Sequence, residues 1–137
     1  MINAVLEFVS ACPLIEGKRV MLNYLDDGIG AYALENVSDA YTVKEYTDGE
    51  RLCAVRFVFA ARRAITLSKH ENAAVVDFYE GFCRWLEEGT INNQLPQLMR
   101  GRRAVSILPC GSYFVKSTSG TAARYELMIE LRYLESL

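Results

Sequence analysis

The segment "EYTDGERLCAVRFVF", residues 45–59, constrains the fold more than any other part of the chain. Asp48-Gly49 lies between two stretches of strand-forming composition, and an Asp-Gly pair in that position indicates a β-hairpin. The turn can fall in two registers. A two-residue turn at Asp48-Gly49 would pair Thr47 with Glu50 and leave both faces of the hairpin with mixed polarity.

A three-residue loop, residues 47–49, instead pairs Tyr46 with Glu50 and places Glu45 opposite Arg51 as a pair of opposite charges. Gly49 then takes the left-handed conformation, which glycine tolerates because it has no Cβ. In this register the apolar side chains share one face: Tyr41, Val43, Cys53, Val55, Phe57 and Phe59. Because a slip of one residue would turn every side chain over, the pattern favours this loop. A longer loop and a domain-swapped hairpin are the alternatives.

A second pattern predicts a helix over residues 69–88. Ser68 and Glu71 form a capping box at its start, and Gly89 is expected to end it. Its apolar residues follow at helical spacing: Val75, Phe78, Tyr79, Phe82, Trp85 and Leu86. We expect this stripe to cover the apolar face of the hairpin, with Phe78, Phe82 and Trp85 against Val55, Phe57 and Phe59.

Residues 123–133 alternate strictly and predict a long, half-buried strand. One face carries Ala123, Tyr125, Leu127, Ile129, Leu131 and Tyr133, and the other carries Arg124, Glu126, Met128, Glu130 and Arg132. The second face suits a charged interface as well as it suits solvent. The outer strands of such a sheet also offer unpaired backbone groups to a neighbour.

The remaining elements predicted are short: a helix over 3–11 that Pro13 ends, and strands over 19–25, around Tyr32 and Leu34, over 104–108 and over 112–117. Residues 19–25 alternate weakly, with Val20, Leu22 and Tyr24 on one side. The whole chain, residues 1–137, is predicted to be a single α+β domain. Its architecture is an antiparallel β-sheet, one main amphipathic helix packed across it, and a short N-terminal helix.

Composition argues against several kinds of site. The formal net charge is −2, which disfavours a general nucleic-acid binder. The four cysteines form no close pair and His70 is the lone histidine, so we predict no metal, no cofactor and no catalytic residues. Asp26-Asp27 could bind a cation, but the preferred interpretation is that these residues form a turn. We expect no signal peptide and no membrane span, and the cysteine pattern is typical of a reduced, cytosolic protein.

Two arginine clusters are candidate contact sites for phosphate or for an acidic protein surface: "RGRR", residues 100–103, and Arg62-Arg63. The alternative is a solvated loop and strand end, which the slightly negative net charge favours. Together with the charged face of the long strand, the candidate interface comprises Arg62, Arg63, Arg100, Arg102, Arg103, Arg124, Glu126, Glu130 and Arg132.

Four segments support a family resemblance: "VKEYTDGE" at 43–50, "FVFAARR" at 57–63, "DFYEGFCRWLEE" at 77–88 with "LP" at 95–96, and "GTAARYELMIELRY" at 120–133. In this order and spacing the chain resembles the small minor capsid or tail-terminator (tail-completion) proteins of long, non-contractile-tailed bacteriophages and prophages. The segments span residues 41–133.

The resemblance implies a virion structural protein with an α+β fold, no catalytic residues and no small-molecule substrate. Related terminators close the tail tube as a ring, usually sixfold, and contact the tail tube and the head connector. The chain would then occur in the virion and, during assembly, in the host cytoplasm. It would form its homo-oligomeric ring on a tube end rather than in dilute solution. The competing class is a host-encoded small binding module or a small enzyme.

Overall fold

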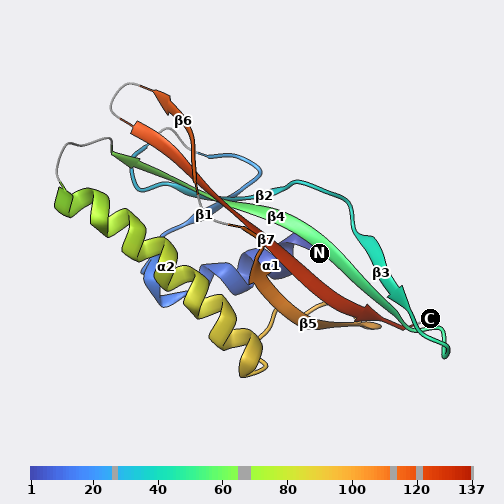
Figure 1. The fold of residues 1–137 in the computed structure, drawn as a ribbon. Coiled ribbons are helices and arrows are strands. Elements are labelled where there is room, and N and C mark those ends of the chain that lie inside the picture. Colours follow the sequence, from blue (N-terminus) through green and yellow to red (C-terminus); the bar gives the residue numbers. More distant parts are fainter. Residues whose placement is uncertain (26–27, 65–68, 112–113, 120–121, 137) are drawn as a thin grey trace.

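The computed structural model describes residues 1–25, 28–64, 69–111, 114–119 and 122–136, and its strands form one sheet (Figure 1). Two strands of 14 residues, β4 (Arg51–Ala64) and β7 (Ala122–Glu135), lie at its centre and pair antiparallel along their whole length. Two shorter strands follow one another along the other side of β4: β2 (Tyr32–Asn36) and β3 (Tyr41–Glu45).

The free side of β7 is shared in the same way by β5 (Arg102–Pro109) and β6 (Phe114–Ser119). The last strand, β1 (Val20–Leu22), pairs with β2 and runs parallel to it. The α+β class is therefore confirmed, but the prediction of a purely antiparallel sheet is wrong at this pair. Two parallel strands cannot be joined by a hairpin, so the chain returns from the end of β1 to the level at which β1 began before β2 starts.

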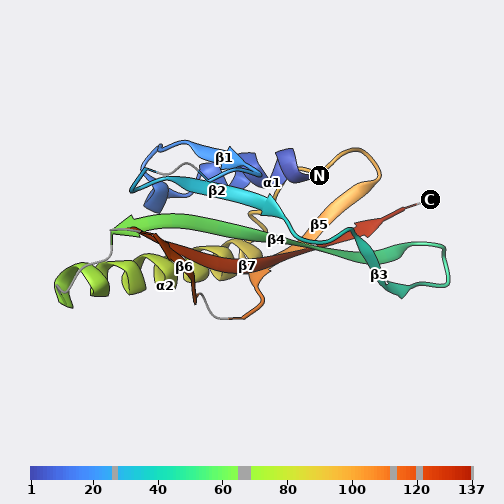
Figure 2. The same ribbon diagram turned by 90° about the horizontal axis from the view of Figure 1, so that it is seen from above.

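Both helices pack on one face of the sheet. The main helix, α2 (Lys69–Ile91), packs against β4, β7 and β5, and α1 (Ile2–Ser10) lies beside it, followed by the single turn η1 (Pro13–Ile15) (Figures 1 and 2). Gly89 was expected to end α2, yet the helix continues to Ile91. A Cβ at position 89 would come within 3.0 Å of the Gln94 carbonyl oxygen, so this glycine permits a close approach of the loop. Ser68 lies outside the described residues.

The core lies between these helices and the inner face of the sheet. Phe82 is fully buried and stacks on Phe59, with ring centroids 4.5 Å apart, and Phe78 contacts the same ring. Packing of the helix on the hairpin is thereby confirmed for these residues. Trp85 is half-buried and packs beside Phe8 of α1 and Phe82. The N-terminal helix thus covers the part of α2 that sequence reasoning had placed against the sheet.

The hairpin has the predicted three-residue loop. Glu45 lies opposite Arg51, the Tyr46 N–H donates to the Glu50 carbonyl oxygen at 2.8 Å, and Gly49 has φ of 88°. The prediction that Tyr41 and Val43 share the core face is wrong. A β-bulge between Thr42 and Lys44 adds one residue to β3, so Tyr41 lies opposite Ala54 on the other face of the sheet.

The alternation of β7 is confirmed, since its odd-numbered residues from 123 to 133 face the core, with Tyr125 half-buried. The prediction that Val20, Leu22 and Tyr24 share one side is wrong, because Val20 is buried whereas Leu22 and Tyr24 are exposed. Asn23 takes a left-handed conformation there, with φ of 55°, and ends the alternation.

Candidate protein-interaction surfaces

The structure places the nine candidate interface residues in three separate regions. Arg124, Glu126, Glu130 and Arg132 lie on the outer face of β7, which is a central strand with partners on both sides. The backbone of this strand is therefore paired inside the chain. β7 is therefore not an edge strand, and the free edges of the sheet belong to shorter strands.

Arg124 joins two carboxylates at one end of the outer face. Its guanidinium forms ion pairs with Glu126 of the same strand, at 2.7 Å, and with Glu35 of β2. The three side chains are 17%, 12% and 26% exposed, respectively. Because one cation neutralises two partly buried anions, this group stabilises the pairing of β2, β4 and β7, and the charge of Arg124 is balanced within the chain.

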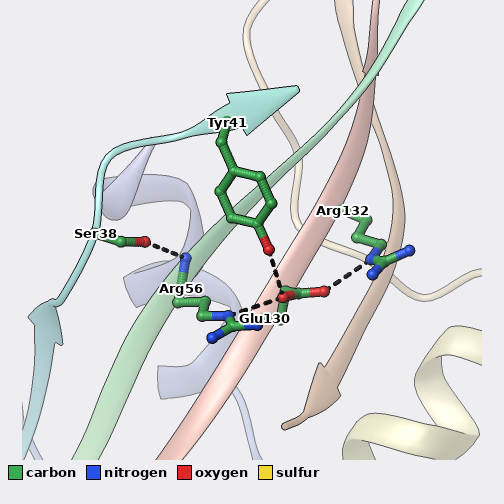
Figure 3. A network of polar contacts seen from close by, with 5 residues as sticks. All are labelled: Ser38, Tyr41, Arg56, Glu130 and Arg132. Carbon is green, nitrogen blue, oxygen red and sulfur yellow. Dashed lines mark hydrogen bonds and ion pairs between the residues drawn. The ribbon is translucent and has the colours of Figure 1, made fainter. Parts of the chain in front are cut away.

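Glu130 is the centre of a second network on the outer face (Figure 3). Its carboxylate accepts hydrogen bonds from Arg132 Nε at 2.8 Å, Arg56 Nε at 3.0 Å and the Tyr41 hydroxyl at 3.1 Å. The Arg56 N–H in turn donates to Ser38 Oγ, at 3.3 Å. These contacts hold β3 and the linker that precedes it onto the two long strands. The bulge in β3 has a structural consequence here, because it turns Tyr41 toward Glu130.

The Glu130 network makes stability depend on pH. Partial burial raises the pKa of Glu130, but hydrogen bonds from Arg132, Arg56 and Tyr41 outweigh this, so the pKa lies below its ordinary value. A carboxylate with a lowered folded-state pKa stabilises the fold above its unfolded pKa of about 4.3, and this contribution is lost as the pH falls through the folded pKa. Glu135 acts in the same direction, because hydrogen bonds from Arg102 and Arg51 lower its pKa.

Substitution of Glu130 by glutamine is expected to lower the free energy of unfolding at pH 7 by about 1 kcal/mol, because three donors lose a charged acceptor. It should also flatten the fall in stability between about pH 5 and pH 3. Urea unfolding at several pH values measures both effects. Glu80→Gln, on the exposed face of α2, is the control. An unchanged pH profile in Glu130→Gln would contradict the role assigned to the network.

The second region, which we call the connector, comprises residues 100–103: Arg100 and Gly101 end the loop after α2, and Arg102 and Arg103 begin β5. Arg100 and Arg103 are exposed, and within the described part of the chain neither has an ion pair. Ile91 and Met99 nearby in sequence are also exposed, at 82% and 68%. Arg102 differs from its neighbours, because its Nε bonds to Glu135 at 2.8 Å and its guanidinium lies over the Tyr133 ring. Two of the three connector arginines are therefore available to a partner.

The third region is the end of β4, where Arg62 and Arg63 point to opposite faces. The Arg63 guanidinium lies over the rings of Tyr32 and Phe78 and donates to the Tyr32 hydroxyl at 2.8 Å. Arg63 therefore contributes to the edge of the core. Backbone groups of Arg62 hydrogen bond with Gly30 and Ala31, which fixes the loop before β2.

One exposed surface was missed by sequence reasoning. All five residues of β3 are exposed, and with the hairpin turn they lie at the end of the sheet that extends past both helices (Figures 1 and 2). Its apolar members are Tyr41, Val43 and Tyr46, exposed at 43%, 41% and 40%. We call this region, residues 41–50, the arm. Sequence reasoning assigned these apolar residues to the core face because it did not detect the bulge in β3.

The described residues contain no group of three or more His, Cys, Asp or Glu side chains placed to hold a metal ion. No helix among them is long and apolar enough to cross a membrane. A hollow of about 640 Å³ lies where α1, the linker before β3 and the inner face of the sheet meet, and its lining includes Ser38, Val55 and Tyr133. Asp26-Asp27 and the side chain of His70 fall outside the described part.

No protein-family model matches this chain, and none of the curated proteins matches it significantly.

Proposed function

We propose that this chain is a virion structural protein of a long, non-contractile-tailed phage or prophage, a tail terminator or another head–tail joining component that acts by forming a ring. The observation that carries the proposal is the arm. This end of the sheet extends past the helices and has exposed apolar residues and a free strand edge. It contributes little to the stability of a monomer, and such a surface is typical of a contact with another protein. The four segments of the family resemblance support the same assignment.

The connector supplies the surface for other virion proteins in this proposal. Arg100 and Arg103 are exposed and have no ion pair among the residues that the structure describes, and Met99 beside them is apolar and exposed. A tail tube or head connector that presents carboxylates at its rim would pair with these arginines, and the contact would weaken as salt is added. Arg102 is not counted in this surface, because its Nε bonds to Glu135 within the chain and it is less exposed than its two neighbours.

The experiment uses tail tubes assembled from the tube protein of the same phage, mixed with the purified chain and viewed by negative-stain electron microscopy. The expected result is a ring on one end of each tube. The double variant Arg100→Glu/Arg103→Glu should fold normally and leave the tube ends bare. The matched control, Arg19→Glu/Arg84→Glu, reverses two exposed arginines away from the connector and should still form rings.

Failure of the unaltered chain to bind tube ends would overturn the proposed function. Normal ring formation by the connector variant would show instead that Arg100 and Arg103 do not contact the tube.

A further inference from the structure

Four strands at the arm end of the sheet place alternating charges in one row. Glu45 of β3 lies opposite Arg51 of β4, Arg51 lies opposite Glu135 of β7, and Glu135 lies opposite Arg102 of β5. Directly opposed residues project from the same face of a sheet. Inside the row, Glu135 binds both arginines. The row therefore begins with an anion on one outer strand and ends with a cation on the other.

The two ends of the row lie on outer strands, and at the β5 end the Arg102 N–H already donates to the Met99 carbonyl oxygen, at 3.0 Å, in the turn before the strand. In the described part of the chain β3 pairs only with β4, and β5 pairs only with β7. The Tyr46 N–H donates to the Glu50 carbonyl oxygen, so the backbone groups of Tyr46 point toward β4. Successive residues of a strand point their backbone groups to opposite sides, so those of Glu45 point away from β4. The Glu45 side chain has no ion pair or hydrogen bond among the described residues.

Strand direction decides how a second copy can fit. Each neighbouring pair among β3, β4, β7 and β5 is antiparallel, so β3 and β5 run in opposite senses. If β5 of a second copy is placed beside β3 in the same overall orientation, the new pair is again antiparallel. The helices of both copies then stay on the same side of a continuous sheet. Such a contact is head-to-tail, and repeated contacts close into a ring when the rotation permits.

We propose that the arm binds the free edge of β5 on a second copy of this chain, so that the sheet continues from subunit to subunit. This rests on the proposed ring and names its contact. In a straight continuation of the row, Glu45 lies opposite Arg102 of the neighbour and diagonal to its Arg100, within reach of both. The alternation of charge then continues across the junction.

Exposed apolar residues occur on both edges and support the same contact. The arm exposes Tyr41 and Val43, and β5 exposes Val105 and Leu108. The straight register has one unfavourable feature, because Lys44 would lie opposite Arg103. Glu50 lines the same hollow as Arg103 and reduces that repulsion.

Cysteine cross-linking of the purified full chain at high concentration tests the contact. One preparation carries Glu45→Cys and the other Arg100→Cys, and a short thiol cross-linker is added to each alone and to their mixture. A head-to-tail contact predicts covalent dimers in the mixture and not in either single preparation, beyond the background of the unaltered chain with its four native cysteines. A second substitution, Glu45→Arg, in the Arg100→Cys chain is the control. It changes an arm that takes no part in the cross-linked pair, because the Glu45→Cys chain supplies the arm. The yield of dimers should therefore not fall.

Dimers in either single preparation at the level of the mixture would indicate a two-fold contact and overturn the proposal. So would a mixture with no dimers above background. Cross-linking without binding to tube ends would uphold the contact and reject the phage function. Ring formation on tubes without this cross-link would uphold the function and reject the contact.

Discussion

Replacement of Phe82 by alanine is expected to lower the free energy of unfolding by about 3–5 kcal/mol, which is the range for a fully buried aromatic side chain. Phe82 has no solvent exposure, and its ring stacks on Phe59 of β4 at 4.5 Å. Removing the ring opens a cavity between α2 and the sheet at the point where the two layers meet. Urea denaturation followed by fluorescence and circular dichroism measures the change.

The control is Val76→Ala on the same helix, because Val76 is exposed and its truncation should change stability by less than about 0.5 kcal/mol. Trp85→Ala is expected to fall between the two, since the half-buried indole contacts Phe8 and Phe82 rather than the sheet. A loss below about 1 kcal/mol for Phe82→Ala would contradict the packing of α2 on β4.

Local patterns predicted the elements whose signal is contained in one stretch of sequence. The Asp48-Gly49 turn, the alternation over 123–133 and the apolar stripe of α2 each follow from steric or periodic rules that do not depend on distant residues. The bulge at Val43 could not be predicted in this way. It lets the Tyr41 hydroxyl reach Glu130, 89 residues further along the chain, and no local rule specifies that contact.

The candidate interface was predicted by residue type, and residue type does not distinguish a paired arginine from an unpaired one. Arg102 and Arg103 are neighbours in sequence, yet Arg102 binds Glu135 whereas Arg103 is exposed. The difference arises because successive residues of a strand face opposite sides of the sheet, and Arg102 projects on the side where Glu135 lies opposite it. Glu45, the anion at the end of the charged row, became a candidate only when the strand order was known.

Replacement of Arg124 by leucine is expected to lower the free energy of unfolding by about 2–3 kcal/mol, somewhat below the value for removing one partner of a fully buried ion pair. Glu35 and Glu126 would be left near each other, partly buried and without their cation. Chemical denaturation at pH 7 measures the loss. Glu35→Gln in the same chain should restore part of it, because one of the two facing charges is then absent.

Arg132→Leu is the matched control, since Arg132 lies on the same face of the same strand but is 44% exposed. Its partner Glu130 retains Arg56 and Tyr41, so the expected loss is below about 1 kcal/mol. If Arg124→Leu proved as mild as this control, Arg124 would be free to serve a partner, and the candidate interface would extend over the outer face of β7. A large loss for Arg124 alone would confine the contact surfaces to the arm, the connector and the edge of β5.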